Sequence, residues 1–120
     1  MDSVVFSIIL LIAGTAFAAG PRLECVAPAH DFGAVGSTTV VAHVFLIVNA
    51  GDAPLQIDWT RVCCGATADW ATNVVAVGTS TTLRVTLAMA GKMGRVERAI
   101  YVMSNDPIRP IFRLTLTAEP

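Results

Sequence analysis

After Pro21 the chain alternates apolar and polar positions with a period of two, and no stretch keeps helical spacing for three turns. The clearest run is Thr81–Met89, in which Leu83, Val85 and Leu87 alternate with small or polar residues. Such alternation is typical of a strand that buries one face. Turn-forming residues separate the runs, so the pattern predicts strands at Leu23–Val26, Thr38–Asn49, Leu55–Val62, Val74–Val77, Thr81–Met89, Val96–Met103 and Ile111–Thr117.

The number and spacing of these strands are typical of an immunoglobulin-like sandwich. The chain has 120 residues, which is enough for one hydrophobic core and too few for two. We therefore predict an all-β fold, a single Ig-like antiparallel β-sandwich over residues 20–120. A hydrophobic signal or anchor helix is predicted to precede it over residues 1–19.

That N-terminal segment contains an uncharged apolar run, Val4–Phe17, which ends in Ala16-Phe17-Ala18. The pattern favours cleavage of a signal peptide after Ala18 or Ala19. No Lys or Arg precedes the run, as a signal peptide would have, so an uncleaved anchor stays open as the alternative. The run is, however, shorter than the ~20 residues that span a bilayer. Both predict export to the periplasm or cell envelope, with membrane contact through residues 4–19 in the anchored form.

The predicted strand Thr38–Asn49 is apolar on both faces. Phe45 and Ile47 are expected in the core, with His43 on the same side. A contiguous exposed apolar patch usually marks a contact with a partner, although valine and alanine also suit strands anywhere. We therefore predict an interface on the opposite face, which carries Val40, Ala42, Val44, Leu46 and Val48.

Of four further large side chains, three are candidates for this interface and one is assigned to the core. Tyr101 and Met103 are expected to support the interface from a later strand. Trp70 lies in a predicted polar loop, where it could anchor a partner or pack locally. Trp59 alternates with Leu55 and Ile57 and is predicted to lie in the core.

Charge and motif content exclude several classes of function. The chain carries 8 basic and 9 acidic residues, a net charge of −1, and has no basic stripe for nucleic acid. It has no nucleophile elbow, phosphate-binding loop or paired-carboxylate motif. We therefore expect no catalytic residues, no cofactor and no nucleic-acid partner.

The three cysteines, Cys25, Cys63 and Cys64, leave alternatives open. A disulfide from Cys25 to Cys63 or Cys64 would close a loop of roughly 40 residues and stabilise the fold by about 4 kcal/mol in the chain-entropy model. Reduced structural thiols are the main alternative. A bond between Cys63 and Cys64 would strain the intervening peptide, and we do not expect it.

Metal binding would require Cys25, Cys63 and Cys64 to converge with His30 or His43. No zinc-site spacing supports this, and the methionines that could assist copper binding are scattered. Thiol or metal handling at Cys63 and Cys64, with copper or zinc, is kept as the alternative function.

Several motifs follow one another in a family-specific order. They are HDFGAV (30–35), VAHVFLIVNAGDAPLQI (41–57), CCGAT (63–67), VGTSTTLRVTL (77–87) and GRVERAIYVMSNDP (94–107). The order resembles a bacterial extracytoplasmic domain-of-unknown-function family, numbered 1573, whose wider relatives are PapD-like and spindle- or cilia-associated Ig-like sandwiches. The resemblance implies a fold and an extracytoplasmic location, and no established reaction.

One motif departs from the family pattern. The Cys-Gly-Cys of the resemblance reads Cys64-Gly65-Ala66 here, and Cys63 is added before it. The other motifs have structural explanations, since the residues of Asn49–Pro54 and Ser104–Pro107 are typical of turns. We therefore predict a non-enzymatic exported domain acting in protein–protein association. Its expected partner is another chain, a second copy or a subunit of a membrane complex, in which it would serve as an accessory or structural subunit of the cell envelope.

Overall fold

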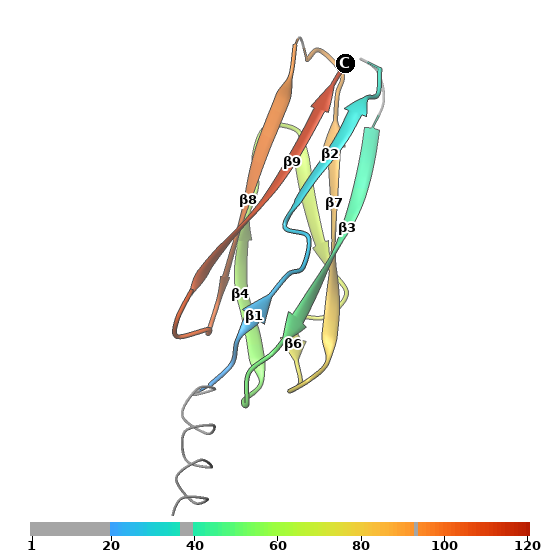
Figure 1. Cartoon of the computed structure of the whole chain (residues 1–120). Helices are drawn as coiled ribbons and strands as arrows, with labels where there is room; N and C mark the ends of the chain where they lie inside the picture. The colour runs from blue at the N-terminus through green and yellow to red at the C-terminus, as the bar shows by residue number, and fades with distance from the viewer. Residues whose placement is uncertain (1–19, 37–39, 93) are drawn as a thin grey trace, which may run out of the picture.

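The computed structural model describes residues 20–36, 40–92 and 94–120, which form two β-sheets packed face to face (Figure 1). One sheet has the strand order β1-β3-β7-β5 and the other β2-β9-β8-β4-β6. The predicted all-β sandwich is thereby confirmed. The strands are β1 Leu23–Glu24, β2 Ala29–Ala34, β3 Val40–Asn49, β4 Leu55–Arg61, β5 Ala66–Trp70, β6 Val74–Val75, β7 Ser80–Ala88, β8 Val96–Ser104 and β9 Ile111–Glu119.

All seven predicted strands are present, with ends that lie within two residues of the prediction. β2 and β5 were not predicted. The sequence of β2, AHDFGA, and that of β5, ATADW, have too few large apolar residues to show alternation. The predicted signal or anchor segment, residues 1–19, lies outside the described residues. Within the described ranges, no helix is long and apolar enough to cross a membrane.

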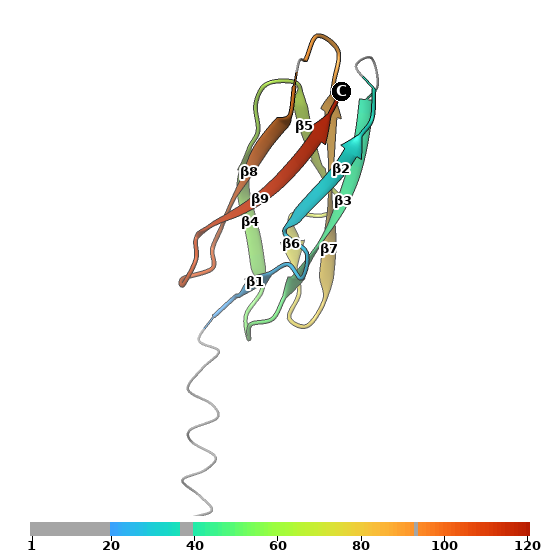
Figure 2. The same cartoon turned by 45° about the horizontal axis from the view of Figure 1, so that its top comes forward.

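The prediction of a wholly antiparallel fold is wrong at one edge. β1 pairs antiparallel with β3 in one sheet. The chain then crosses to the other sheet, where β2 pairs parallel with β9. The backbone N–H of Thr115 donates to the carbonyl of Pro28 at the crossing (2.9 Å). Figure 2 shows β2 beside β9 and β3 along this edge, so one continuous segment holds both sheets together.

The core lies between the two sheets and follows the predicted alternation. On β7, Leu83, Val85 and Leu87 are fully buried, and Phe45 and Ile47 of the neighbouring strand β3 point into the core beside them, as predicted. Burying a side chain of this size stabilises the fold by about 1.5–3 kcal/mol. The other sheet contributes Leu55, Ile57, Val75, Ile100, Val102, Phe112, Leu114 and Leu116.

The turn after β3 is organised by the buried side chain of Asn49. Its Oδ1 accepts hydrogen bonds from the N–H groups of Arg22 and Gly51, and its Nδ2 donates to the carbonyls of Ala53 and Val75. Gly51 is required here, because a Cβ at this position would lie 2.1 Å from the carbonyl oxygen of Gly20. The structural interpretation of this motif is confirmed.

Candidate functional site

The outer face of the five-stranded sheet is hollowed where β4, β8 and β9 lie side by side. The hollow encloses about 270 Å³ and is lined by Trp59, Arg61, Tyr101 and Ile111. The strand register arranges these side chains in two rows across the sheet. An apolar row runs Trp59–Met103–Ile111, and the next row runs Arg61–Tyr101–Arg113.

Trp59 reaches this surface because β4 contains a bulge. The register with β8 shifts between Ile57 and Trp59, so that Ile57 is buried while Asp58 and Trp59 are both exposed. The Trp59 side chain is 40% exposed. The prediction of a core Trp59 is therefore wrong, because strict alternation cannot show an extra residue in a strand.

The second row gives the hollow its charge. The Arg61 guanidinium lies 5.1 Å from the centroid of the Trp59 ring, a cation–π contact. In the described part of the chain, neither Arg61 nor Arg113 forms an ion pair, and both side chains are exposed. The face thus combines exposed aromatic rings with cations that have no carboxylate partner in the described residues.

The predicted apolar stripe on β3 lies on the opposite side of the molecule. Val40, Val44 and Leu46 are exposed on the outer face of the four-stranded sheet, as expected, and Val48 is half-buried. Tyr101 and Met103 lie on β8 in the other sheet, so they cannot support this stripe as predicted. Beside the stripe, on the same outer face, the neighbouring strand β7 presents Thr82, Arg84 and Thr86, so the apolar stripe is one strand wide.

Trp70 lies in a strand rather than in the predicted loop. It is the last residue of β5 and is half-buried against the core. Its indole N–H donates to the hydroxyl of Thr60 on β4 (2.7 Å). The side chain therefore connects the two sheets, and the structure gives no support for a role as an exposed partner anchor.

His30 of β2 and His43 of β3 stack between the edges of the two sheets. Their ring centroids are 3.8 Å apart and the planes differ by 10°. The rings of Phe32 and Phe45 close the stack edge-on, each with its centroid 4.7 Å from a histidine. Burial, and secondly the charge that His30 can carry, lower the pKa of His43. The described arrangement makes these histidines part of an aromatic cluster.

The cysteines are arranged differently from the prediction. Cys63 and Cys64 form a disulfide with each other, and Cys25 has a free thiol. Cys25 is half-buried against the core, and this burial raises the pKa of its thiol. β1 starts beside Asn49 at the opposite end of the sandwich from the end of β4, whose seven residues span about 20 Å. This separation explains why Cys25 does not reach Cys63 or Cys64.

The candidate metal ligands are also separated. Cys25, the pair Cys63–Cys64 and the pair His30–His43 form three distinct groups. Within the residues described, no group of three or more His, Cys, Asp or Glu side chains could hold a metal ion.

The two sheets and their crossing strand define an immunoglobulin-like, PapD-like β-sandwich. The chain belongs to the family described as "Protein of unknown function (DUF1573)", whose model matches residues 23–119. The membership predicted from the order of the motifs is confirmed. Comparison with curated proteins gives no match.

Solved structures share this fold at low identity. A protein of unknown function from Porphyromonas gingivalis W83 has a TM-score of 0.77 at 23% identity, over 86% of this chain and 48% of its own. PapD-like domain 7 of human CEP192 has a TM-score of 0.62 at 8% identity, over 82% of this chain and 84% of its own. The E. coli chaperone DraB has a TM-score of 0.57 at 14% identity, over 85% and 56%. The chain thus spans about half the length of the Porphyromonas protein.

Proposed function

We propose that this domain acts in protein–protein association through the outer face of β4, β8 and β9. Its partner presents an extended segment in which an apolar side chain lies next to acidic ones. The observation that carries the proposal is the pair of adjacent rows, Trp59–Met103–Ile111 and Arg61–Tyr101–Arg113. The apolar side chain enters the hollow, and the carboxylates meet the two arginines.

The residue types of this face suit such a partner. Trp, Tyr and Arg supply most of the binding energy in protein interfaces, because they bury a large area and still offer a polar group. Arginine also binds carboxylates through two parallel N–H groups. A carboxylate from a partner would satisfy Arg61 and Arg113, which form no ion pair among the described residues.

The stripe on β3 is a weaker candidate for the same role. It is one strand wide and contains only valine, alanine and leucine at its exposed positions. It therefore offers neither a hollow for an anchor side chain nor a charge that selects a partner. The solved structures described as chaperones, DraB among them, support the class of function through their shared fold alone.

Selection from a displayed library of random short peptides, followed by NMR mapping, tests the proposal. We expect the selected peptides to be enriched in Asp or Glu beside an aromatic or aliphatic residue, and to shift resonances of Trp59 and Tyr101. Trp59→Ala should weaken binding about tenfold or more. Leu46→Ala serves as the matched control, because Leu46 is 51% exposed on the opposite sheet. Failure to enrich acidic peptides, or mapping to the β3 face, would overturn the proposal.

We further propose that the domain works outside the cytoplasm, as part of the cell envelope. The apolar run Val4–Phe17 and its Ala16-Phe17-Ala18 ending support this location. Intact mass of the native protein, combined with cell fractionation, is the test. A chain that starts at Ala19 or Gly20 in the periplasm supports a cleaved signal, and a full chain in the membrane fraction supports an anchor. Recovery of the full chain in the cytoplasm would contradict both.

A further inference from the structure

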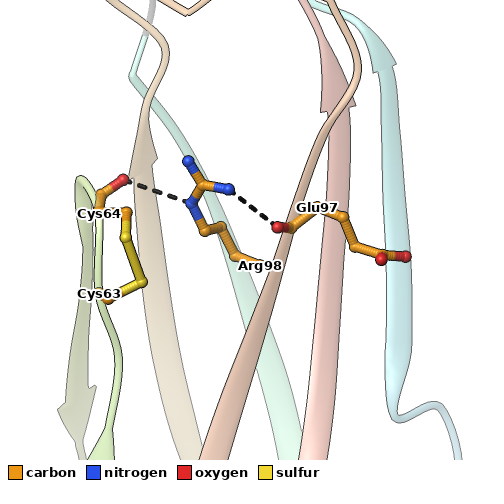
Figure 3. Close-up of a disulfide and its surroundings, with 4 residues drawn as sticks. All are labelled: Cys63, Cys64, Glu97 and Arg98. Carbon is orange, nitrogen blue, oxygen red and sulfur yellow. Dashed lines mark hydrogen bonds between the residues drawn. A yellow bond between two sulfur atoms is a disulfide. The ribbon is translucent and has the colours of Figure 1, made fainter.

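The turn that joins β4 to β5 carries two adjacent cysteines on the surface. Both Cys63 and Cys64 are exposed, and their sulfur atoms are bonded to each other (Figure 3). Neither contributes to the hydrophobic core, whereas the free Cys25 packs against it. A disulfide in this position is open to attack by another thiol, since access is one of the factors that set the rate of exchange.

Two cations lie beside this turn. The Arg98 side chain reaches across from β8, and its Nε donates to the carbonyl oxygen of Cys64 (3.4 Å). Figure 3 shows the guanidinium next to the cysteine pair, while the carboxylate of Glu97 points away from it. The ammonium of Lys92 lies near the next residue of the turn, since a Cβ at Gly65 would be 3.1 Å from its Nζ. Nearby positive charge favours a thiolate over a thiol.

The turn has backbone contacts that do not depend on the disulfide. The N–H of Ala66 donates to the carbonyl of Cys63 (3.1 Å), and the N–H of Ala88 on β7 donates to the carbonyl of Gly65 (2.9 Å). Cys64 itself has a φ of 63°, in the left-handed region that few residues other than glycine adopt. The turn is therefore held in place by hydrogen bonds as well as by the disulfide.

We propose that Cys63–Cys64 is a thiol–disulfide exchange site that accepts two electrons from a dithiol substrate. A thiolate of the dithiol attacks the Cys63 sulfur, the Cys63–Cys64 bond breaks, and Cys64 leaves as a thiolate beside Arg98. The second thiol of the substrate then attacks the substrate sulfur that is bonded to Cys63, and Cys63 is released as a thiol. The substrate ends as a disulfide and this chain as a dithiol, with two protons and two electrons transferred.

Alkylation of the native protein tests the site, with dithiothreitol as the probe. In a Cys25→Ala variant purified without reductant, we expect no alkylation before dithiothreitol and alkylation of both remaining cysteines after it. The far-UV circular dichroism should not change. Alkylation before reduction would show that the thiols are free, and alkylation only in denaturant would show that the bond is not accessible. Either result overturns the proposal.

The rate of reduction tests the role of the cations. Arg98→Gln should slow reduction by dithiothreitol about two- to fivefold, because the leaving thiolate loses a neighbouring positive charge. Arg98→Lys should recover most of the rate, which a loss of packing would not explain. Arg84→Gln on the outer face of β7 is the matched control and should leave the rate unchanged. Equal rates of reduction in Arg98→Gln and Arg84→Gln would show that Arg98 does not assist the exchange.

Discussion

The carboxylate of Asp106 accepts a hydrogen bond of 2.9 Å from the backbone N–H of Leu23, 83 positions earlier in the chain. The same carboxylate accepts hydrogen bonds from the N–H groups of Ile108 and Arg109, and the residue is 1% exposed. It therefore joins β1 of one sheet to the β8–β9 turn of the other. This contact gives the Ser-Asn-Asp-Pro motif its structural role.

Replacing Asp106 with Ala should destabilise the fold by about 3 kcal/mol, because three backbone N–H groups lose their acceptor, and one of them, that of Leu23, is buried. Urea unfolding followed by fluorescence measures the loss. Asp52→Ala is the control, because the Asp52 carboxylate also accepts a backbone N–H, that of Gly20, but in an exposed place (2.6 Å). An equal loss of stability in the two variants would show that burial of the Asp106 carboxylate does not increase its contribution.

Gly51→Ala should be more destabilising than Gly78→Ala. A Cβ at Gly51 would meet the backbone of Gly20 at 2.1 Å, whereas a Cβ at Gly78 meets nothing within 4 Å. Gly78 has a φ of +75°, so its replacement costs about 1–2 kcal/mol through backbone conformation alone. Thermal unfolding of both variants separates the two effects. A smaller loss at Gly51 would show that the turn can move away from Gly20.

Truncation of two neighbouring residues of β3 should reduce the stability of the fold by very different amounts. Phe45 is 1% exposed and Leu46 is 51% exposed. Phe45→Ala should therefore cost about 3–5 kcal/mol, and Leu46→Ala less than about 1 kcal/mol. Chemical denaturation measures both. A reversed order would mean that β3 is shifted by one residue in its pairing with β7.

Stability should fall as the pH drops below about 6.5, the ordinary pKa of histidine. The pKa of His43 is lowered in the folded chain by burial and by His30, so the unfolded chain binds the proton first. The stability that neutral His43 contributes is fully present above the pKa of His43 in the unfolded chain. It is lost as the pH falls from that pKa to the lower pKa of the folded chain. The residues paired with the two histidines, Val85 on β7 and Leu116 on β9, carry no charge.

Urea midpoints at about pH 7.5 and pH 5.5 measure this effect in the wild type and in His43→Gln. The variant should lose less stability than the wild type between the two conditions. Asp31 does not change its charge between about pH 7.5 and pH 5.5. The hydrogen bond from the N–H of Gly33 is the main reason that the pKa of the Asp31 carboxyl lies below its usual value. Equal losses in both proteins would show that His43 does not couple to folding.

The sequence predicted the parts of the fold in which alternation is strong. The strands around Phe45 and Leu83 and the inward direction of their side chains follow from apolar periodicity, and the motifs around Asn49 and Asp106 follow from turn chemistry. β2 escaped prediction because AHDFGA has too few large apolar residues to show alternation, and only its pairing with β9 makes it a strand.

The candidate sites were less predictable, because each depends on a local departure from regularity. The bulge before Trp59 moves its ring from the expected core position to the surface. A bond between Cys63 and Cys64 was not expected, but β4 ends at Arg61, and a turn with positive φ at Cys64 brings their sulfurs together. No residue pattern in a single sequence signals either event.

The parallel pairing of β2 with β9 has a mechanical consequence. Both strands run along the long axis of the sandwich, and β1 and the C-terminus lie toward opposite ends of it (Figure 1). Tension between these ends pulls β2 and β9 past each other along their length, so their hydrogen bonds share the load instead of opening one after another. The edge that joins the two sheets is thus also the edge that resists stretching.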